Sequence, residues 1–347
     1  MTTGVAGATG ATGAADSAGS AYRAGRVEHV LVVGGGAIGS SWAAHFLLHG
    51  LRVTVVDPDP AVRAVVAQRA VALVGEVEPA RTRTAGTALA VSQHPEPAAA
   101  ATDLVVECGP EREDVKQDLF ARLDRAAPPD VLLTSSSSGL LPSALQAACG
   151  LQPERVLVAH PFNPPHLLPL VELVGGARTA TAALDAAETI FSGVGKRVVR
   201  VHGERPGHVV NRLQAALWRE AYHLVAEGAV SVADVDTALA WGPGLRWALL
   251  GPFVTQHLSG GDGGIEHVLA HLGPPMAQWW DDLGTPTLTP ELVRAVVAGV
   301  ADAVGDTDLT ALRARRDAAL QDLVRLKGEA GLDPTAAPPV PDTPADR

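Results

Sequence analysis

Three glycines directly after a short valine-rich run constrain the fold of this chain more than any other feature. Gly34, Gly36 and Gly39 have the spacing G-x-G-x-x-G, between a strand-like run at 27–33 and a helical pattern at 40–49. The first glycine permits a tight turn, the second lets a phosphate group approach the backbone, and the third lets the helix pack against the strand. Because amides at a helix N-terminus bind phosphates, the pattern predicts a dinucleotide-binding turn.

An acidic residue follows the next strand-like run at the spacing expected of a ribose ligand. The run covers 51–56, and Asp57 comes 23 residues after Gly34. A carboxylate at this position accepts hydrogen bonds from a ribose 2′-hydroxyl and repels a 2′-phosphate, so it favours NAD over NADP. A glycine-rich turn without a ligand is the alternative, but it does not explain why strand, helix and acid occur together.

Short apolar runs continue to alternate with helical patterns as far as about residue 200. These runs lie at 87–91, 103–107, 131–134, 156–159, 167–174 and 197–201. From about residue 208 the β pattern stops, and the chain up to about Lys327 has the pattern of helices separated by glycine and proline. The expected fold class is therefore α/β, with an N-terminal Rossmann-like, doubly wound parallel sheet followed by an all-α C-terminal domain.

Composition and pattern divide the chain into four segments. We expect a disordered leader at 1–22, a nucleotide-binding domain at 23–205, a helical domain at 206–330 and a proline-rich tail at 331–347. The leader consists mostly of Ala, Gly, Thr and Ser, and it lacks the basic start and apolar block of a signal peptide. Within the helical domain, Ser231 and Asp234 form a variant capping box that is expected to open a helix.

Charge and cysteine spacing exclude several classes of function. The formal net charge of −11 argues against nucleic acid as a partner, because that interaction needs a cationic face. No run of about 18 apolar residues is present, so no membrane span is expected. Cys108 and Cys149 lack metal-site or C-x-x-C spacing, which indicates reduced thiols in a cytoplasmic protein. No cluster of metal-ligand residues is visible, so no metal is expected.

A histidine and a glutamate lie on two strand-like runs that flank a proline-rich turn. His160 directly follows the run at 156–159, and Glu172 lies twelve positions later within the run at 167–174. If the two strands pair, the side chains meet, and the carboxylate fixes the tautomer of the imidazole and raises its basicity. The pair then suits general acid–base chemistry. A structural ion pair around a core histidine is the alternative, and this stretch alone leaves both open.

Other polar side chains also follow the ends of strand-like runs. Glu111 comes soon after the run at 103–107, and the serines at 135–138 come after the run at 131–134. Ligands of doubly wound sheets bind beyond the carboxyl ends of the strands, so these residues and His160 are expected to face one crevice. A helix N-cap or polar turn is the alternative for the serine run, and at least one serine is expected to serve in that way.

Taken in order, the motifs resemble those of the 3-hydroxyacyl-CoA dehydrogenase family. Within that family they are most similar to the branch that contains L-carnitine dehydrogenase and lambda-crystallin, which is an L-gulonate 3-dehydrogenase. The resemblance covers roughly residues 27–327. The motifs that carry the resemblance are GGGAIGSSWA, VVECGPE followed by Lys116, TSSSSGL, HPFNPPHLLPLVELV, ERPGHVVNRL and GPGLRWALLGPFVTQHLSGGDGG.

The resemblance implies catalytic roles for four residues. His160 stands at the position of the family's general base, and Glu172 stands at the acid that orients this base. Ser138 matches the serine that hydrogen-bonds the substrate oxygen, and Asn211 matches the asparagine that helps to hold the reacting group.

The resemblance also implies which residues contact NAD. They are Gly34, Gly36, Ala37, Ile38, Gly39, Asp57, Glu111, Lys116, Ser136 and Asn163. Ser136 stands where the hydroxyacyl-CoA enzymes have an asparagine, so the chain departs from the family's pattern at this contact.

The substrate is less constrained by the sequence than the cofactor is. CoA-dependent relatives carry lysines on a helical hairpin after the second strand, whereas the stretch between Asp57 and Asp103 contains no lysine and is short for such a hairpin. This weakens the case for a CoA ester. The cationic candidates that remain in the stretch are Arg63, Arg69, Arg81 and Arg83.

Aromatic residues of the second domain favour a small cationic substrate. Carnitine is a 3-hydroxy acid with a quaternary ammonium, and aromatic faces hold such cations at about 0.5–2 kcal/mol per contact. Trp241, Trp247 and Phe253 are candidates for such a cage, and Arg246 is a candidate for binding the substrate carboxylate. The alternative is that the aromatic residues are core anchors between helices.

The expected function is NAD-dependent oxidation of the 3-hydroxyl of a small, carnitine-like L-3-hydroxy acid to the 3-keto acid, with His160 as general base. L-gulonate, a 3-hydroxyacyl thioester and a β-hydroxy acid of a specialised pathway are alternative substrates. A non-enzymatic, NAD-binding structural protein is the alternative of another class, and the intact catalytic residues argue against it. The resemblance further implies a homodimer through residues 206–330.

Overall fold

The computed structural model describes residues 22, 23, 25 and 27–332, and the chain divides into two compact units. The first unit comprises Met1–Val74, Ala80–His160 and Leu170–Glu204, and the second comprises Gly75–Pro79, Pro161–Pro169 and Arg205–Arg347. The expected leader and tail lie outside the described residues except for Tyr22, Gly331 and Leu332. The expectation is wrong for Tyr22, because its side chain is buried in the core of the first unit.

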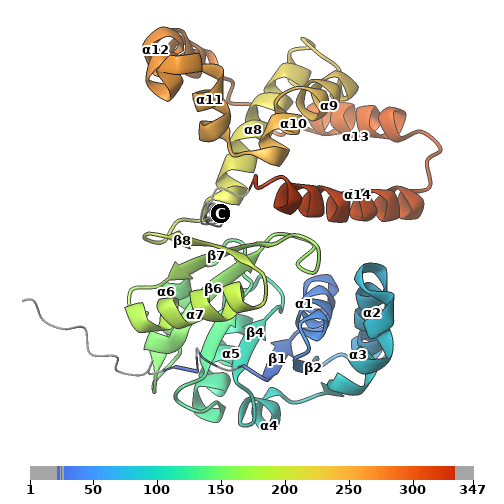
Figure 1. Cartoon of the computed structure of the whole chain (residues 1–347), viewed down its shortest axis with the longest axis vertical. Helices are drawn as coiled ribbons and strands as arrows, with labels where there is room; N and C mark the ends of the chain where they lie inside the picture. Colours follow the sequence, from blue (N-terminus) through green and yellow to red (C-terminus); the bar gives the residue numbers. More distant parts are fainter. Residues whose placement is uncertain (1–21, 24, 26, 333–347) are drawn as a thin grey trace, which may run out of the picture. The chain divides into compact units, whose positions relative to one another are not determined.

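A sheet of eight strands, counted in the described part of the chain, forms the centre of the first unit (Figure 1). The strand order is β3-β2-β1-β4-β5-β6-β7-β8, whose first six strands follow the order of the Rossmann fold. The strands are β1 (His29–Val33), β2 (Arg52–Val56), β3 (Leu89–Ser92), β4 (Leu104–Glu107), β5 (Leu132–Ser135), β6 (Val156–Pro161), β7 (Leu170–Gly175) and β8 (Arg197–Val201).

Strands β1 to β6 pair in parallel, which brings their carboxyl ends to one edge of the sheet. Strand β7 is hydrogen-bonded to β6. The connection at 162–169 is too short for a crossover, so these two strands run antiparallel. The expected pairing of the histidine strand with the glutamate strand is thereby confirmed.

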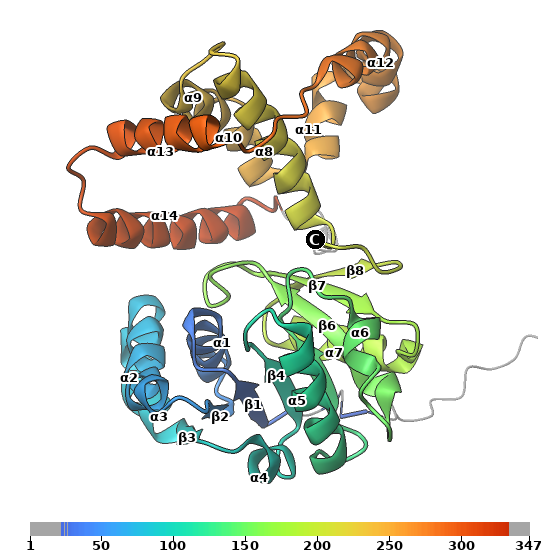
Figure 2. The same cartoon turned by 180° about the vertical axis from the view of Figure 1, so that it is seen from behind.

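Helices cover both faces of this sheet (Figures 1 and 2). One apolar core contains residues of α1, α2, α3 and α7, and the other contains residues of α4, α5 and α6. Strand β1 contributes Val30 and Val32 to the first core and Leu31 to the second, as expected of a strand that is buried on both sides. The helices are α1 (Ala37–Leu48), α2 (Pro60–Val77), α3 (Thr82–Ala88), α4 (Pro95–Ala99), α5 (Glu113–Ala126), α6 (Pro142–Gln146) and α7 (Thr181–Gly193).

The region between the second strand and the fourth differs most from the sequence-based expectation. It folds as α2, α3, β3 and α4, and β3 begins at Leu89 because the two preceding residues complete α3. A helix pair does follow β2, but α3 has only seven residues. Helix α4 is five residues long and begins at Pro95, so it is too short to show a helical period in the sequence.

The second unit is helical from Val210 onward, as the expected fold class requires. The sequence-predicted capping box is confirmed, because Ser231 and Asp234 cap α9 through reciprocal hydrogen bonds. None of the helices in the described residues is long and apolar enough to cross a membrane. The helices of this unit are α8 (Val210–Ala226), α9 (Val232–Trp241), α10 (Pro243–Leu249), α11 (Pro252–Ser259), α12 (Gly264–Asp282), α13 (Pro290–Val304) and α14 (Leu309–Glu329).

A buried lysine lies in the core of the first unit, just before β8. The ammonium nitrogen of Lys196 lies 4.8 Å from the ring centroid of Trp42, and the lysine is 2% exposed. Burial disfavours the charged form and lowers the pKa of Lys196 to about 7. The folded chain therefore holds this group close to its titration midpoint at neutral pH.

The free energy of unfolding should rise between about pH 7 and pH 10.5, and Lys196→Met should flatten this rise. In that interval the unfolded lysine keeps its proton while the folded lysine loses it, so raising the pH favours the folded state. The slope contributed by one such group is at most about 1.4 kcal/mol per pH unit. Urea denaturation of both proteins across this range measures it. Parallel curves for the two proteins would contradict the prediction.

Candidate active site

The glycine turn between β1 and α1 has the geometry that the sequence predicts. Gly34 has a φ of +102°, and its amide donates a hydrogen bond to the carbonyl oxygen of Val56 at 2.7 Å. A Cβ added to Gly39 would lie 1.8 Å from the carbonyl oxygen of Gly34, so the helix can lie this close only with glycine there. A Cβ added to Gly36 would meet no atom within 4 Å, which leaves space beside the first residues of α1, Ala37 and Ile38.

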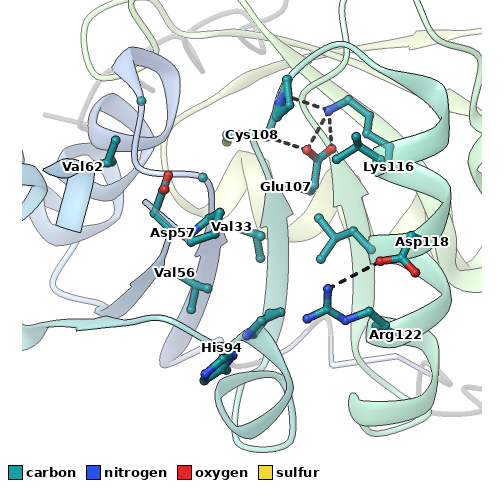
Figure 3. A pocket seen from close by; sticks show the side chains of 18 of the residues that line it. Val33, Val56, Asp57, Val62, His94, Glu107, Cys108, Lys116, Asp118 and Arg122 are labelled. Carbon is teal, nitrogen blue, oxygen red and sulfur yellow. Dashed lines mark hydrogen bonds and ion pairs between the residues drawn. The ribbon is translucent and has the colours of Figure 1, made fainter. Parts of the chain in front are cut away.

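Asp57 lies at the carboxyl end of β2 and turns its carboxylate toward the glycine turn (Figure 3). Its oxygens accept hydrogen bonds from the backbone amides of Gly35 at 2.8 Å and Asp59 at 2.9 Å. These two bonds fix the orientation of the carboxylate. Arg63 lies close by, but its guanidinium donates to the backbone carbonyl oxygens of Asp57 and Pro58.

The glycine turn and Asp57 line a cavity of about 840 Å³. Figure 3 shows it between the strands and the helix that carries Lys116 and Arg122. This volume lies in the range of small-molecule and cofactor sites. Open space at Gly36, a carboxylate at Asp57 and a cavity that both residues line fit the binding of NAD.

Lys116 lines the same cavity, but its ammonium group is already engaged. It donates to both carboxylate oxygens of Glu107 at 2.7 Å and to the carbonyl oxygen of Gly109 at 3.2 Å. Glu107 also accepts from the hydroxyl of Ser135 at 2.6 Å. Sequence reasoning missed Glu107, although a carboxylate at the end of a fully apolar strand is the signal that could have found it.

Glu111 holds the turn that contains the predicted catalytic serine. Its Oε1 accepts hydrogen bonds from the hydroxyl of Ser137 at 2.5 Å, the amide of Gly139 at 2.8 Å and the amide of Leu140 at 3.1 Å. Burial raises the pKa of Glu111, but these hydrogen bonds outweigh it and the net pKa lies below its usual value. Ser138 lies inside this turn and is exposed.

The first three of the four serines at 135–138 have separate partners. Ser135 donates to Glu107, and Ser136 accepts a hydrogen bond from the indole of Trp42. The hydroxyl of Ser137 accepts from the amide of Leu140 at 2.9 Å, so this residue forms the polar turn that was expected of at least one serine.

His160 and Glu172 meet across the pair formed by β6 and β7. Nδ1 of His160 lies 2.8 Å from Oε2 of Glu172, and the two residues are 5% and 1% exposed. Because a carboxylate accepts from Nδ1–H, Nε2 is left as the basic nitrogen of the imidazole. The arrangement can therefore take up a proton at Nε2 while Glu172 stabilises the imidazolium that forms.

The remaining predicted site residues belong to the second unit. Asn163 precedes a cis peptide bond to Pro164, Asn211 lies in the first turn of α8, and Arg246 lies in α10. Trp241 is 77% exposed and Phe253 is 78% exposed. The alternative that these two aromatic residues are core anchors is therefore wrong, and Trp247 is also exposed.

A dinucleotide turn followed by an acid is typical of an NAD-binding domain, and the comparisons with known proteins show that the chain is an NAD-dependent oxidoreductase. Residues 29–205 match the NAD binding domain of 3-hydroxyacyl-CoA dehydrogenase, and residues 207–303 match the C-terminal domain of that enzyme. The chain belongs to the 3-hydroxyacyl-CoA dehydrogenase family, and its cofactor is NAD.

Known proteins resemble the chain over most of its length. It is 44% identical to an L-carnitine dehydrogenase of Streptomyces coelicolor, over 88% of this chain and 96% of that one. It is 41% identical to an L-carnitine dehydrogenase of Pseudomonas putida, over 84% and 91%. Among solved structures, an NAD+-dependent 5-formyl-3-hydroxy-2-methylpyridine 4-carboxylic acid 5-dehydrogenase shares 25% identity with a TM-score of 0.71, over 87% of this chain and 99% of that one.

Two glycine substitutions should separate folding from cofactor binding. Gly39→Ala should lower the free energy of unfolding by about 1–3 kcal/mol or more, because its Cβ would lie 1.8 Å from a backbone oxygen. Gly36→Ala should leave stability nearly unchanged and weaken NAD binding about tenfold or more, because its Cβ would enter the space left for the phosphates. Thermal unfolding and calorimetric titration with NAD measure the two effects. Equal NAD affinity in Gly36→Ala and the wild type would refute the phosphate assignment.

Proposed function

We propose that this protein oxidises the 3-hydroxyl of a small L-3-hydroxy acid, with carnitine as the first candidate, to the 3-keto acid. The observation that carries the proposal is the buried contact of 2.8 Å between Nδ1 of His160 and Oε2 of Glu172. This pair lies in the same unit as the dinucleotide turn, at the edge of the sheet where ligands of this fold bind.

In the proposed mechanism His160 is the general base. Nε2 removes the proton of the substrate hydroxyl, and Glu172 stabilises the resulting imidazolium through Nδ1–H. Bound NAD supplies the hydride acceptor. Ser138, in the turn held by Glu111, and Asn211, at the start of α8, donate hydrogen bonds to the developing carbonyl oxygen.

Cofactor binding in this proposal uses the glycine turn for the phosphates and Asp57 for the ribose. The nicotinamide lies near Ser138 and Asn163, and Ser136 is a further proposed contact of NAD. Lys116 contributes by holding Glu107 and the backbone at Gly109, because all three of its ammonium hydrogens have acceptors within the chain. Glu111 likewise contributes through the turn that it holds.

Two observations support a carnitine-like substrate over a CoA ester. The relatives named above are L-carnitine dehydrogenases with 41–44% identity. The helices that follow β2 carry no lysine, whereas CoA needs cations for its phosphates. We further propose that Trp241, Trp247 and Phe253 hold the quaternary ammonium and that Arg246 binds the carboxylate. L-gulonate and specialised β-hydroxy acids stay alternative substrates.

Parallel assays with NAD and three substrates test this function. We expect NADH formation from L-carnitine and little from L-gulonate or 3-hydroxybutyryl-CoA. Turnover of the CoA ester alone would refute the substrate assignment while leaving the proton-transfer chemistry in place.

Trp241→Leu and Phe253→Leu test the proposed cage. Each substitution should raise the KM for carnitine and leave the Kd for NAD unchanged.

His160→Ala should lower the kcat at least about a hundredfold, because general base catalysis contributes about 10²–10⁴. The Kd for NAD should stay within about twofold of the wild type, because His160 removes a proton and does not bind the phosphates or the ribose. Glu172→Gln is the matched variant. It keeps the size of the side chain and removes its charge, so kcat should fall less than in His160→Ala. Turnover of His160→Ala at the wild-type rate would refute the assignment of the base.

We also propose that residues 206–330 form a substrate and dimerisation domain. Large apolar side chains are exposed on most helices of the second unit, which is unusual for a surface that meets only water. A second copy of the chain is the proposed occupant. Representative exposed residues are Leu213, Trp218, Leu258, Leu269, Trp279, Trp280, Val297 and Leu309.

Multi-angle light scattering at micromolar concentration should give twice the mass of one chain. The expected dimer follows from burying these apolar side chains, since each square ångström removed from water contributes about 25 cal/mol. A monomer across the micromolar range would refute dimerisation without affecting the proposed chemistry.

A further inference from the structure

Trp42 makes a hydrogen bond that belongs neither to the glycine turn nor to the pair of His160 and Glu172. It lies in the second turn of α1, the helix whose N-terminus faces the proposed phosphate site, and it is fully buried. Its indole Nε1–H donates a hydrogen bond of 3.1 Å to the hydroxyl oxygen of Ser136. The two residues are 94 positions apart, so the bond joins α1 to the end of β5.

The indole ring is held in one orientation by its neighbours. Phe46 stacks on it with 5.2 Å between ring centroids and 10° between planes, and Phe191 lies at 5.7 Å. His45 meets it edge-on, and the ammonium nitrogen of Lys196 lies over the ring. A ring fixed on these sides cannot rotate to another acceptor, so the direction of its N–H is fixed as well.

Ser136 is held at both its backbone and its side chain. Its amide donates to the carbonyl oxygen of Glu107 at 2.8 Å, which aligns it with the end of β4. Its hydroxyl lies 3.5 Å from the sulfur of Cys108, a residue of the cavity wall. Cys108 in turn packs against the first glycine, because a Cβ added to Gly34 would lie 2.8 Å from the carbonyl carbon of Cys108.

We propose that Trp42 is a positioning residue for the cofactor, which orients the hydroxyl of Ser136 and ties it to the helix that binds the phosphates. The inference rests on the proposed contact between Ser136 and NAD. An indole N–H is only a donor, so the oxygen of Ser136 must accept from it. The hydroxyl hydrogen is then directed away from Trp42, toward Cys108 or an acceptor of the bound cofactor. Ser136 can replace the family's asparagine as a donor only if this hydrogen is so directed.

The test compares Trp42→Phe, Ser136→Ala and the double variant by calorimetric titration with NAD alone. Trp42→Phe keeps an aromatic ring and removes the N–H, and we expect the Kd for NAD to rise about three- to tenfold, the range of one hydrogen bond. Ser136→Ala should raise it by a similar factor. The double variant should be no weaker than the weaker single variant, because both substitutions break the same contact.

Phe46→Leu is the control for a merely structural role. It removes one of the four groups around the indole and leaves Phe191, His45 and Lys196 in place, so the N–H still points at Ser136. This variant should therefore lower the Tm while the Kd for NAD stays near that of the wild type. A Trp42→Phe protein that loses Tm but binds NAD as tightly as the wild type would overturn the inference.

The titrations use no substrate, so the outcome does not depend on the proposed reaction. If Ser136→Ala binds NAD normally, the proposed contact of Ser136 fails and this inference fails with it. If Ser136→Ala weakens binding and Trp42→Phe does not, only the positioning role fails. The positioning role would also be overturned if the increase in Kd of the double variant equalled the product of the two single increases. Two independent contacts would then have been lost.

Discussion

The ligand-facing edge of the sheet depends on the hydrogen bonds and the ion pair made by one buried carboxylate, that of Glu107. It lies at the end of β4, in the middle of the sheet, and it has no exposure to solvent. A charge in such a place is tolerated only if its hydrogen-bonding capacity is filled, and breaking a buried pair typically destabilises by about 3–5 kcal/mol. Lys116, Ser135 and the amide of Gly109 fill that capacity. The end of β4, the end of β5 and the start of α5 are therefore held in one arrangement.

A fixed edge explains why four consecutive serines can have four different environments. The hydroxyl of Ser135 donates a hydrogen bond to Glu107, and the amide of Ser136 continues the pairing of β5 with β4. The chain then turns under the control of Glu111, whose carboxylate collects three donors and leaves Ser138 exposed. The catalytic role proposed for Ser138 needs a hydroxyl whose position is set by groups other than the substrate, and the turn held by Glu111 meets that requirement.

The parts of the site that the sequence predicts are those encoded by short-range patterns. The glycine turn and Asp57 follow from spacing within one strand–helix–strand unit, and the meeting of His160 with Glu172 follows from two strands joined by a short turn. The contact between Trp42 and Ser136 spans 94 positions and depends on how α1 packs on the sheet. No local pattern carries that information, because Trp42 has the same apolar periodicity as any core residue of a helix.

The exposure of Trp241 and Phe253 could not be predicted for a related reason. An aromatic residue at helical spacing is equally compatible with a core position and with a binding surface, and only the packing of neighbouring helices decides between them. In the described chain these residues are exposed on α9 and α11. Sequence pattern therefore predicts a side chain's chemistry better than its burial.

The two units contribute different kinds of information about the reaction. A histidine held by a carboxylate takes a proton from any correctly placed hydroxyl, so the first unit defines a class of chemistry and does not select among hydroxy acids. An aromatic face distinguishes a quaternary ammonium from a neutral sugar acid by up to about 2 kcal/mol per contact, which is roughly thirtyfold. Two or three such faces are enough to separate carnitine from gulonate. Under the proposed function the helical unit selects the substrate, because it carries the proposed cage, while the first unit carries the proposed base, its orienting acid and the cofactor turn.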